Sequence, residues 1–179
     1  MSDHVGIALI DAGLRRHIGR ARVGHFATTD GRSPALVPVC FVLLGDTLYQ
    51  ALDAKPKSTA SGELRRVRNV RANPSAALLI DHYEEDWTRL WYVLLRGEAR
   101  VLDHGPEQRR AIAALKRKYP QYRTTLPLAA DALVIALAVR QISHWRASSP
   151  VRRRAGRRAP PPKRCESTGF RSSGHRSGR

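Results

Sequence analysis

The chain has 179 residues, enough for one domain with a hydrophobic core, and a net charge of +17. About half of that charge lies after residue 147, where ten Lys/Arg accompany one acidic residue, so the charge does not classify the folded part as nucleic-acid-binding. Two cysteines without metal-ligand spacing, no secretion pattern and no long apolar run predict a cytoplasmic protein without disulfide framework, metal site or membrane anchor.

The first third of the chain predicts a helix followed by strands. Apolar residues at steps of three and four indicate a helix over residues 3–19. Strand-like runs follow at residues 23–29, 36–43 and 47–52. A turn at Gly45-Asp46 predicts that the second and third runs pair as a hairpin.

A basic stretch follows this hairpin. It opens with Lys55, Lys57 and Ser58, continues into a helix over residues 63–69, and ends at Asn73-Pro74 before a strand at residues 76–80. A cationic loop leading into a helix start favours a bound anion such as phosphate, because free N–H groups and the helix dipole add to the side-chain charge. A solvated basic turn is the alternative interpretation.

The remaining elements favour a β-rich fold. We expect an acidic loop at residues 81–87, a strand at 91–101, a helix at 106–119 and a last strand at 132–145. Strands outnumber helices and several are joined by short turns, which predicts a mostly antiparallel β-barrel with helical additions. Residues 1–147 form this domain.

Residues 148–179 are rich in Arg, Pro, Ser and Gly and almost lack apolar side chains, so we expect a disordered tail. A nucleic-acid-binding arm, an appended segment without function and a shifted reading frame are the three interpretations of this tail. Nucleic acid is expected as a partner only through it.

The order of motifs resembles a known family. The motifs are Phe26 to Pro34, Val37 to Phe41, Lys55-Pro56-Lys57, Leu64 to Asn69, Asn73-Pro74 and Ala76 to Asp81. Together they resemble the pyridoxamine 5′-phosphate oxidase-like flavin/deazaflavin split-barrel superfamily. Residues 81–91 and 118–123 are similar to the actinobacterial branch of probable coenzyme F420-dependent enzymes. The resemblance covers about residues 10 to 147.

This resemblance implies a homodimeric split β-barrel with a cofactor groove at the subunit interface. It places Arg66 where the flavin oxidases carry a phosphate-binding lysine, with Asn69 on the same helix. The strand before the hairpin would line the deazaflavin ring, and the basic loop would reach the phosphate and acidic tail of F420. The implied cofactor-binding residues are Pro38, Val39, Cys40, Lys55, Lys57, Ser58, Arg66 and Asn69.

Coenzyme F420 is the expected cofactor and FMN the alternative. The chain departs from true pyridoxamine phosphate oxidases, since no Arg or Lys occurs between Ser33 and Ala54. That departure counts against FMN held in their manner and against pyridoxamine phosphate as substrate. The expected function is an F420-dependent oxidoreductase acting on a small molecule; an FMN-dependent enzyme and a non-catalytic F420-binding protein are the rivals.

No catalytic residue is predicted, because the cofactor supplies the chemistry. Tyr122, Trp87 and Trp91 are candidates for substrate contact, with ordinary packing as the competing role. We expect Asp81 to pair with an arginine and His25 to have a structural role. The segment from His82 to Asp86 carries metal-ligating side chains without a recognised spacing, so solvated side chains are expected there.

Overall fold

The computed structural model describes residues 10–52 and 64–147. Three α-helices, seven strands and two short 3₁₀ helices make up these residues. In chain order they are α1 (Ala12–Arg20), β1 (Gly24–Thr29), β2 (Pro34–Val39), β3 (Val42–Leu44), β4 (Thr47–Ala51), α2 (Arg65–Ala72), β5 (Ser75–His82), η1 (Trp87–Arg89), β6 (Trp91–Leu102), α3 (Pro106–Lys118), η2 (Pro120–Tyr122) and β7 (Val134–Arg146).

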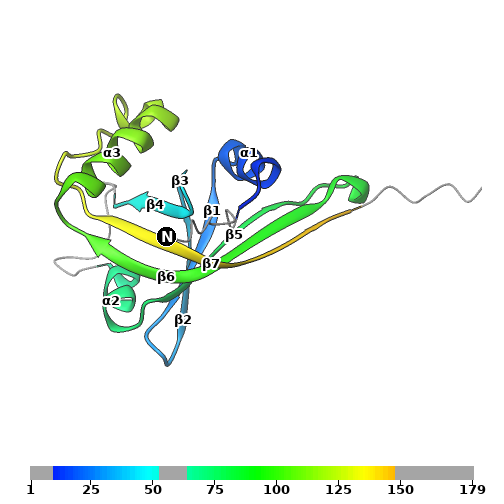
Figure 1. Cartoon of the computed structure of the whole chain (residues 1–179), viewed down its shortest axis with the longest axis horizontal. Coiled ribbons are helices and arrows are strands. Elements are labelled where there is room, and N and C mark those ends of the chain that lie inside the picture. The colour runs from blue at the N-terminus through cyan, green and yellow to red at the C-terminus, as the bar shows by residue number, and fades with distance from the viewer. Residues whose placement is uncertain (1–9, 53–63, 148–179) are drawn as a thin grey trace, which may run out of the picture. The chain divides into compact units, whose positions relative to one another are not determined.

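The strands form one curled antiparallel sheet in the order β2-β1-β5-β6-β7-β4-β3 (Figure 1). The predicted single strand over residues 36–43 is wrong, because Cys40 and Phe41 interrupt it. These two residues connect β2 and β3, which lie at opposite edges of the sheet. Such a short connection between the two edges requires the sheet to curl on itself, so the predicted mainly-β split barrel with flanking helices is confirmed.

The long strands β6 and β7 bend at Gly97. The pairing register shifts there, since Arg96 faces Gln141 while Gly97 faces Val139. A Cβ atom at Gly97 would lie 1.9 Å from the carbonyl oxygen of Ala138, so no other residue fits the crossing. The bulge lets one half of β7 pair with β4 while the other half continues along β6 alone.

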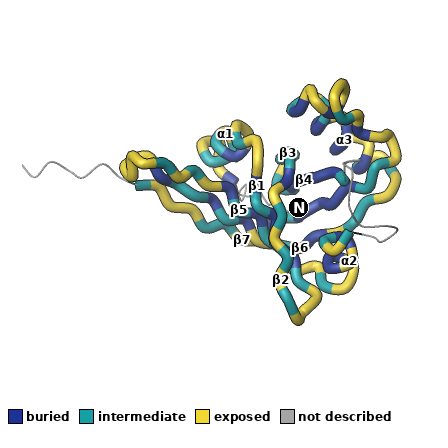
Figure 2. Tube along the Cα trace, turned by 180° about the vertical axis from the view of Figure 1, so that it is seen from behind, coloured by how far each residue is buried: buried dark blue, intermediate teal, exposed yellow. Residues whose placement is uncertain are grey.

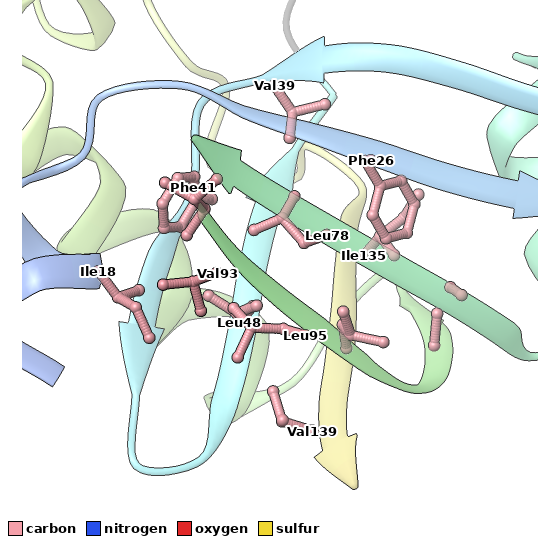
Figure 3. Close-up of a cluster of buried hydrophobic side chains, with 14 of the residues drawn as sticks. Ile18, Phe26, Val39, Phe41, Leu48, Leu78, Val93, Leu95, Ile135 and Val139 are labelled. Atoms are coloured by element: carbon pink, nitrogen blue, oxygen red, sulfur yellow. The ribbon is translucent and has the colours of Figure 1, made fainter. Parts of the chain in front are cut away.

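The buried apolar side chains form two clusters. Figure 2 shows how far each described residue is buried along the chain. The larger cluster lies inside the curled sheet and includes Ile18, Phe26, Phe41, Leu48, Leu78, Val93, Leu95, Ile135 and Val139 (Figure 3). The smaller one packs α3 and η2 against β4 and the start of β7. α1 and α2 bury their apolar faces in the larger cluster through Ile18, Val67 and Val70, which explains the helical spacing in the sequence.

Two element boundaries differ from the sequence expectation. α1 begins at Ala12, where the Asp11 carboxylate accepts hydrogen bonds from the amides of Gly13 and Leu14. The earlier part of the predicted helix lies outside the described residues. Asp81 and His82, expected in a loop, are the last residues of β5. Within the described ranges, no helix is long and apolar enough to cross a membrane.

Candidate cofactor-binding surface

Helix α2 presents a row of arginines beside the barrel. Its apolar residues Val67 and Val70 are buried against the sheet, which leaves Arg65, Arg68 and Arg71 exposed on the other side. Arg66 is half-buried at the start of the same helix. Lys55, Lys57 and Ser58, predicted to extend this cationic group, lie outside the described residues.

The turn between β1 and β2 is joined to the start of α2. Arg65 donates a hydrogen bond to the hydroxyl of Ser33. One Asp30 oxygen accepts from the amides of Ser33 and Arg32 at 2.9 Å each, and these bonds hold the pKa of Asp30 below its usual value. Gly31 has φ of 88°, which suits glycine. The turn is therefore held in one conformation next to the arginines.

The Asn69 side chain is engaged inside the protein. Asn69 is 3% exposed, and its Nδ2 donates to Oγ1 of Thr28, also buried, at 3.1 Å. This bond ties α2 to β1 and satisfies two buried polar groups. The contact of Asn69 with a cofactor stays a prediction. In the structure the side-chain amide nitrogen is bonded to Thr28.

A hollow of about 270 Å³ adjoins the β1–β2 turn. Its walls come from β1, β2, β5 and β6, and its lining includes Ala27, Thr29, Pro34, Ala77, Arg96 and Gly97. Small side chains leave the backbone accessible to a flat ring, and Arg96 adds a positive charge at the rim. The Arg96 guanidinium also donates to Oγ of Ser143 at 3.3 Å, which holds it over the sheet.

The other predicted site residues lie at the far end of β2. Thr29 pairs with Pro34 beside the turn, whereas Gly24 pairs with Val39 at the opposite end of β2. Five residues of extended strand span about 17 Å. The structure therefore does not gather into one cluster those predicted site residues that it describes. A ligand that contacts both the β1–β2 turn and Cys40 must be elongated.

Cys40 lines a second hollow, of about 250 Å³, with Arg22, Tyr119 and Tyr122. Pro38 is exposed and Val39 is 9% exposed on the adjacent strand. The free thiol of Cys40 is partly accessible. Sequence reasoning placed Cys40 next to a cofactor ring but gave no sign that Tyr119, directly after α3, and η2 would form part of the wall of this hollow.

Lys118, at the end of α3, is a residue that the sequence analysis missed. Its Nζ lies 4.2 Å from the ring centroid of Phe41 and 5.4 Å from that of Tyr119. The Nζ atom is buried and has no hydrogen-bond partner among the described residues. Burial, and then the charge of Arg22, lower the pKa of Lys118 to about 8, although the ring faces attract the ammonium. In the sequence, the position of Lys118 directly before Tyr119-Pro120 is the only signal that could have indicated its burial.

The three aromatic candidates for substrate contact have different environments. Tyr122 is 5% exposed and packs edge-on against Tyr119, with ring centroids 5.7 Å apart. The indole of Trp91 lies against the rings of His17 and His82. Trp87 is 76% exposed. Of the three, Tyr122 is the one that lines the hollow of Cys40.

The acidic segment after β5 forms local ion pairs. The Glu84 carboxylate lies 3.2 Å from Nε2 of His82 and 3.0 Å from Nε of Arg89, and Asp86 caps η1 through Thr88. Within residues 10–52 and 64–147, no three His, Cys, Asp or Glu side chains are arranged to hold a metal ion. Asp81 pairs with Nδ1 of His25 at 3.4 Å, so the expected arginine partner was wrong.

The fold is a split barrel. Its antiparallel sheet curls on itself, and two residues join its two edge strands. The sequence profile of the family described as Pyridoxamine 5′-phosphate oxidase matches residues 11–146. The chain belongs to this family. No curated protein matches it in a sequence comparison.

Solved structures share the fold at low sequence identity. The chain is similar to the conserved hypothetical protein Rv2991 from Mycobacterium tuberculosis, with a TM-score of 0.60 and 15% identity over 82% of this chain and 91% of that one. HutZ, the heme storage protein of Vibrio cholerae, has a TM-score of 0.58 and 13% identity over 76% of this chain and 93% of HutZ. A FAD-binding protein from Mesorhizobium loti has a TM-score of 0.55 and 18% identity over 75% of this chain and 94% of that protein. At such low sequence identity, these similarities show only that the proteins share a fold with this chain.

Proposed function

We propose that this protein is an oxidoreductase that uses coenzyme F420 to reduce or oxidise a small molecule. The observation that carries the proposal is the hydrogen bond from Arg65, in the arginine-rich helix α2, to Ser33 in the fixed β1–β2 turn, which a hollow adjoins. A ligand with several negative charges and a flat ring suits this surface, because cations lie on one side and small side chains on the other.

The residues present fit the charge pattern of F420. That coenzyme carries a phosphodiester and an oligoglutamate chain, so its binding surface needs several cations rather than one. Arg65, Arg66 and Arg68 supply them on α2, and Arg96 adds one at the hollow. When bound, the deazaflavin accepts or donates a hydride at its ring. The chain would orient the ring along β2, where Pro38 is exposed.

FMN is the alternative cofactor, and a non-catalytic binding protein is the alternative function. A FAD-binding protein that shares the fold supports the flavin alternative, and a heme storage protein that shares it supports the non-catalytic alternative. Pyridoxamine phosphate is disfavoured as substrate, because the strands from Ser33 to Ala54 carry no Arg or Lys. The arginines of α2 favour the cofactor with the larger negative charge.

We also propose a homodimer, as the family resemblance implies, because the outer face of the sheet carries exposed apolar side chains. Leu36 is 65% exposed on β2, and Leu79 on β5 and Leu94 on β6 are half-buried side chains of the same face. Trp145 on β7 is 46% exposed beside them. Pairing of two such faces would cover an apolar surface and bring the β2 strands toward a shared groove. A cytoplasmic location remains part of this proposal.

Equilibrium binding of F420 and FMN to the full chain tests the proposal. We expect F420 to bind at least tenfold more tightly than FMN, and Arg66→Gln to weaken F420 binding by about tenfold, as for one charged hydrogen bond. Arg109→Gln, an exposed arginine on α3, is the matched control and should change nothing. Tighter FMN binding would overturn the choice of cofactor, and equal effects of the two variants would overturn the site.

Turnover separates an enzyme from a carrier. Reduced F420 bound to the protein should be oxidised by at least one member of a panel of quinones, nitro compounds and conjugated enones. Binding without oxidation by any of these acceptors would favour the non-catalytic alternative.

A further inference from the structure

A cavity of about 330 Å³ lies between α1 and the far end of the β6–β7 pair. α1 contributes Asp11, Leu14 and His17 to its wall, and the two strands contribute Trp91, His144 and Arg146. Trp91 is five residues along β6 from Arg96, which lines the hollow of the proposed cofactor surface. The cavity is therefore a different place on the sheet. Its volume suits a molecule of one or two rings.

The aromatic wall of this cavity is fixed. The ring of Trp91 meets that of His17 edge-on, with centroids 3.9 Å apart and planes at 69°. On β5, His82 stacks against the same indole at 6.3 Å and 19°. Trp91 is also paired through the backbone with His82 on one side and Arg146 on the other. The indole is thus held by three elements, so a planar ligand meets a preformed surface.

The strand next to Trp91 offers an available cation. Arg146 is exposed, and its side chain forms no hydrogen bond or ion pair with the described residues. Burial, and then the charges of Arg146 and Arg20, lower the pKa of His17, which keeps its imidazole neutral at pH 7 and able to donate or accept one hydrogen bond.

The acidic group in the wall is already engaged. Oδ1 of Asp11 accepts from the amides of Gly13 at 2.7 Å and Leu14 at 2.9 Å, as the N-cap of α1. These bonds and the nearby His144 hold the pKa of Asp11 below its usual value. Asp11 thus serves the helix, while the guanidinium of Arg146 has no carboxylate within ion-pair distance among the described residues.

We propose that this cavity binds a planar aromatic carboxylate of one or two rings, with the ring against Trp91 and the carboxylate on Arg146. His17 and His144 supply further polar contacts at the edge of the ligand. The combination of a rigid indole, a neutral imidazole and a guanidinium without a carboxylate partner in the described part of the chain distinguishes such an acid from a neutral aromatic molecule and from a non-planar acid.

Calorimetric titration of the full chain with 2-naphthoate tests this site. Neutral 2-naphthalenemethanol and non-planar cyclohexanecarboxylate are the comparison probes, and each should bind at least tenfold more weakly. Arg146→Gln should lower 2-naphthoate affinity at least tenfold. Arg140→Gln, on the same strand and paired with Glu98 at 3.3 Å, is the matched control and should leave it unchanged.

Indole resonances locate the bound probe. Of the three tryptophans, Trp91 forms the aromatic wall of the cavity and should shift in the NMR spectrum on adding 2-naphthoate, whereas the exposed Trp87 should not. Equal affinity for the acid and the alcohol, equal effects of the two arginine variants, shifts at Trp87 alone, or no binding at millimolar concentration would each overturn the proposal. None of these results depends on whether F420 binds elsewhere.

Discussion

The hydroxyl of Tyr119 holds the backbone of Phe41 at the point where the barrel is split. It accepts from the Phe41 amide at 3.0 Å and lies 2.8 Å from the Phe41 carbonyl oxygen and 3.0 Å from that of Arg22, to which it can donate. Phe41 is one of the two residues between the edge strands β2 and β3. A single side chain from the end of α3 thus satisfies the backbone where the sheet ladder is interrupted.

Replacing this hydroxyl should be costly. Tyr119→Phe leaves the buried amide and carbonyl of Phe41 without their partner, so we expect the free energy of unfolding to fall by about 1–3 kcal/mol. Urea denaturation measures the change. Tyr83→Phe, at a side chain that is 69% exposed, is the matched control and should change stability by less than about 0.5 kcal/mol. Equal effects of the two substitutions would contradict the structural role of the hydroxyl.

Gly97 should be intolerant of any side chain. A Cβ there would lie 1.9 Å from the Ala138 carbonyl oxygen, so Gly97→Ala has to displace backbone at the bulge. We expect a loss of about 3 kcal/mol or more, or failure to fold. Gly19→Ala in α1 meets no atom within 4 Å and should be neutral or stabilising by up to about 1 kcal/mol. Thermal denaturation of both variants measures the difference.

The strand-rich character, the hairpin at Gly45-Asp46 and the three α-helices could be predicted from the sequence, because they depend on local turn residues and periodicity. The sequence did not contain the break between β2 and β3, since residues 36–43 keep an unbroken strand-like composition through Cys40 and Phe41. That break depends on Tyr119, which lies 78 residues further along the chain from Phe41. Contacts at such separation leave no local pattern in a single sequence.

The candidate site was predicted in part. The arginines of α2 were identified as a charged helix face, but their link to Ser33 through Arg65 depends on how the barrel folds. The partner of Asn69 could not be predicted, because Thr28 reaches it only when β1 and α2 pack together. Cys40 was placed next to a ring, and the buried Lys118 beside Phe41 became visible only in three dimensions.

The buried ammonium of Lys118 should make stability rise with pH in an unusual range. Burial lowers its pKa from 10.5 to about 8 in the folded protein, so between these values the unfolded chain binds more protons and alkali favours folding. Tyr119 acts in the opposite sense, because burial raises its pKa from 10.0 to about 12 and stability falls as pH rises above 10. We therefore expect the melting temperature to increase between about pH 8 and 10 and to decrease above that.

Lys118→Met isolates this contribution. Methionine keeps the apolar contact with the rings of Phe41 and Tyr119 and removes the buried charge, so the variant should be more stable at pH 7 by about 1 kcal/mol, or about 3 °C in Tm. Its Tm should no longer rise from pH 8 to 10, whereas Lys116→Met, two residues earlier on α3, should retain the rise. An equal change of Tm from pH 8 to 10 in Lys118→Met and in the unmodified protein would contradict this contribution and would show that the ring faces of Phe41 and Tyr119 offset the effect of burial on the ammonium.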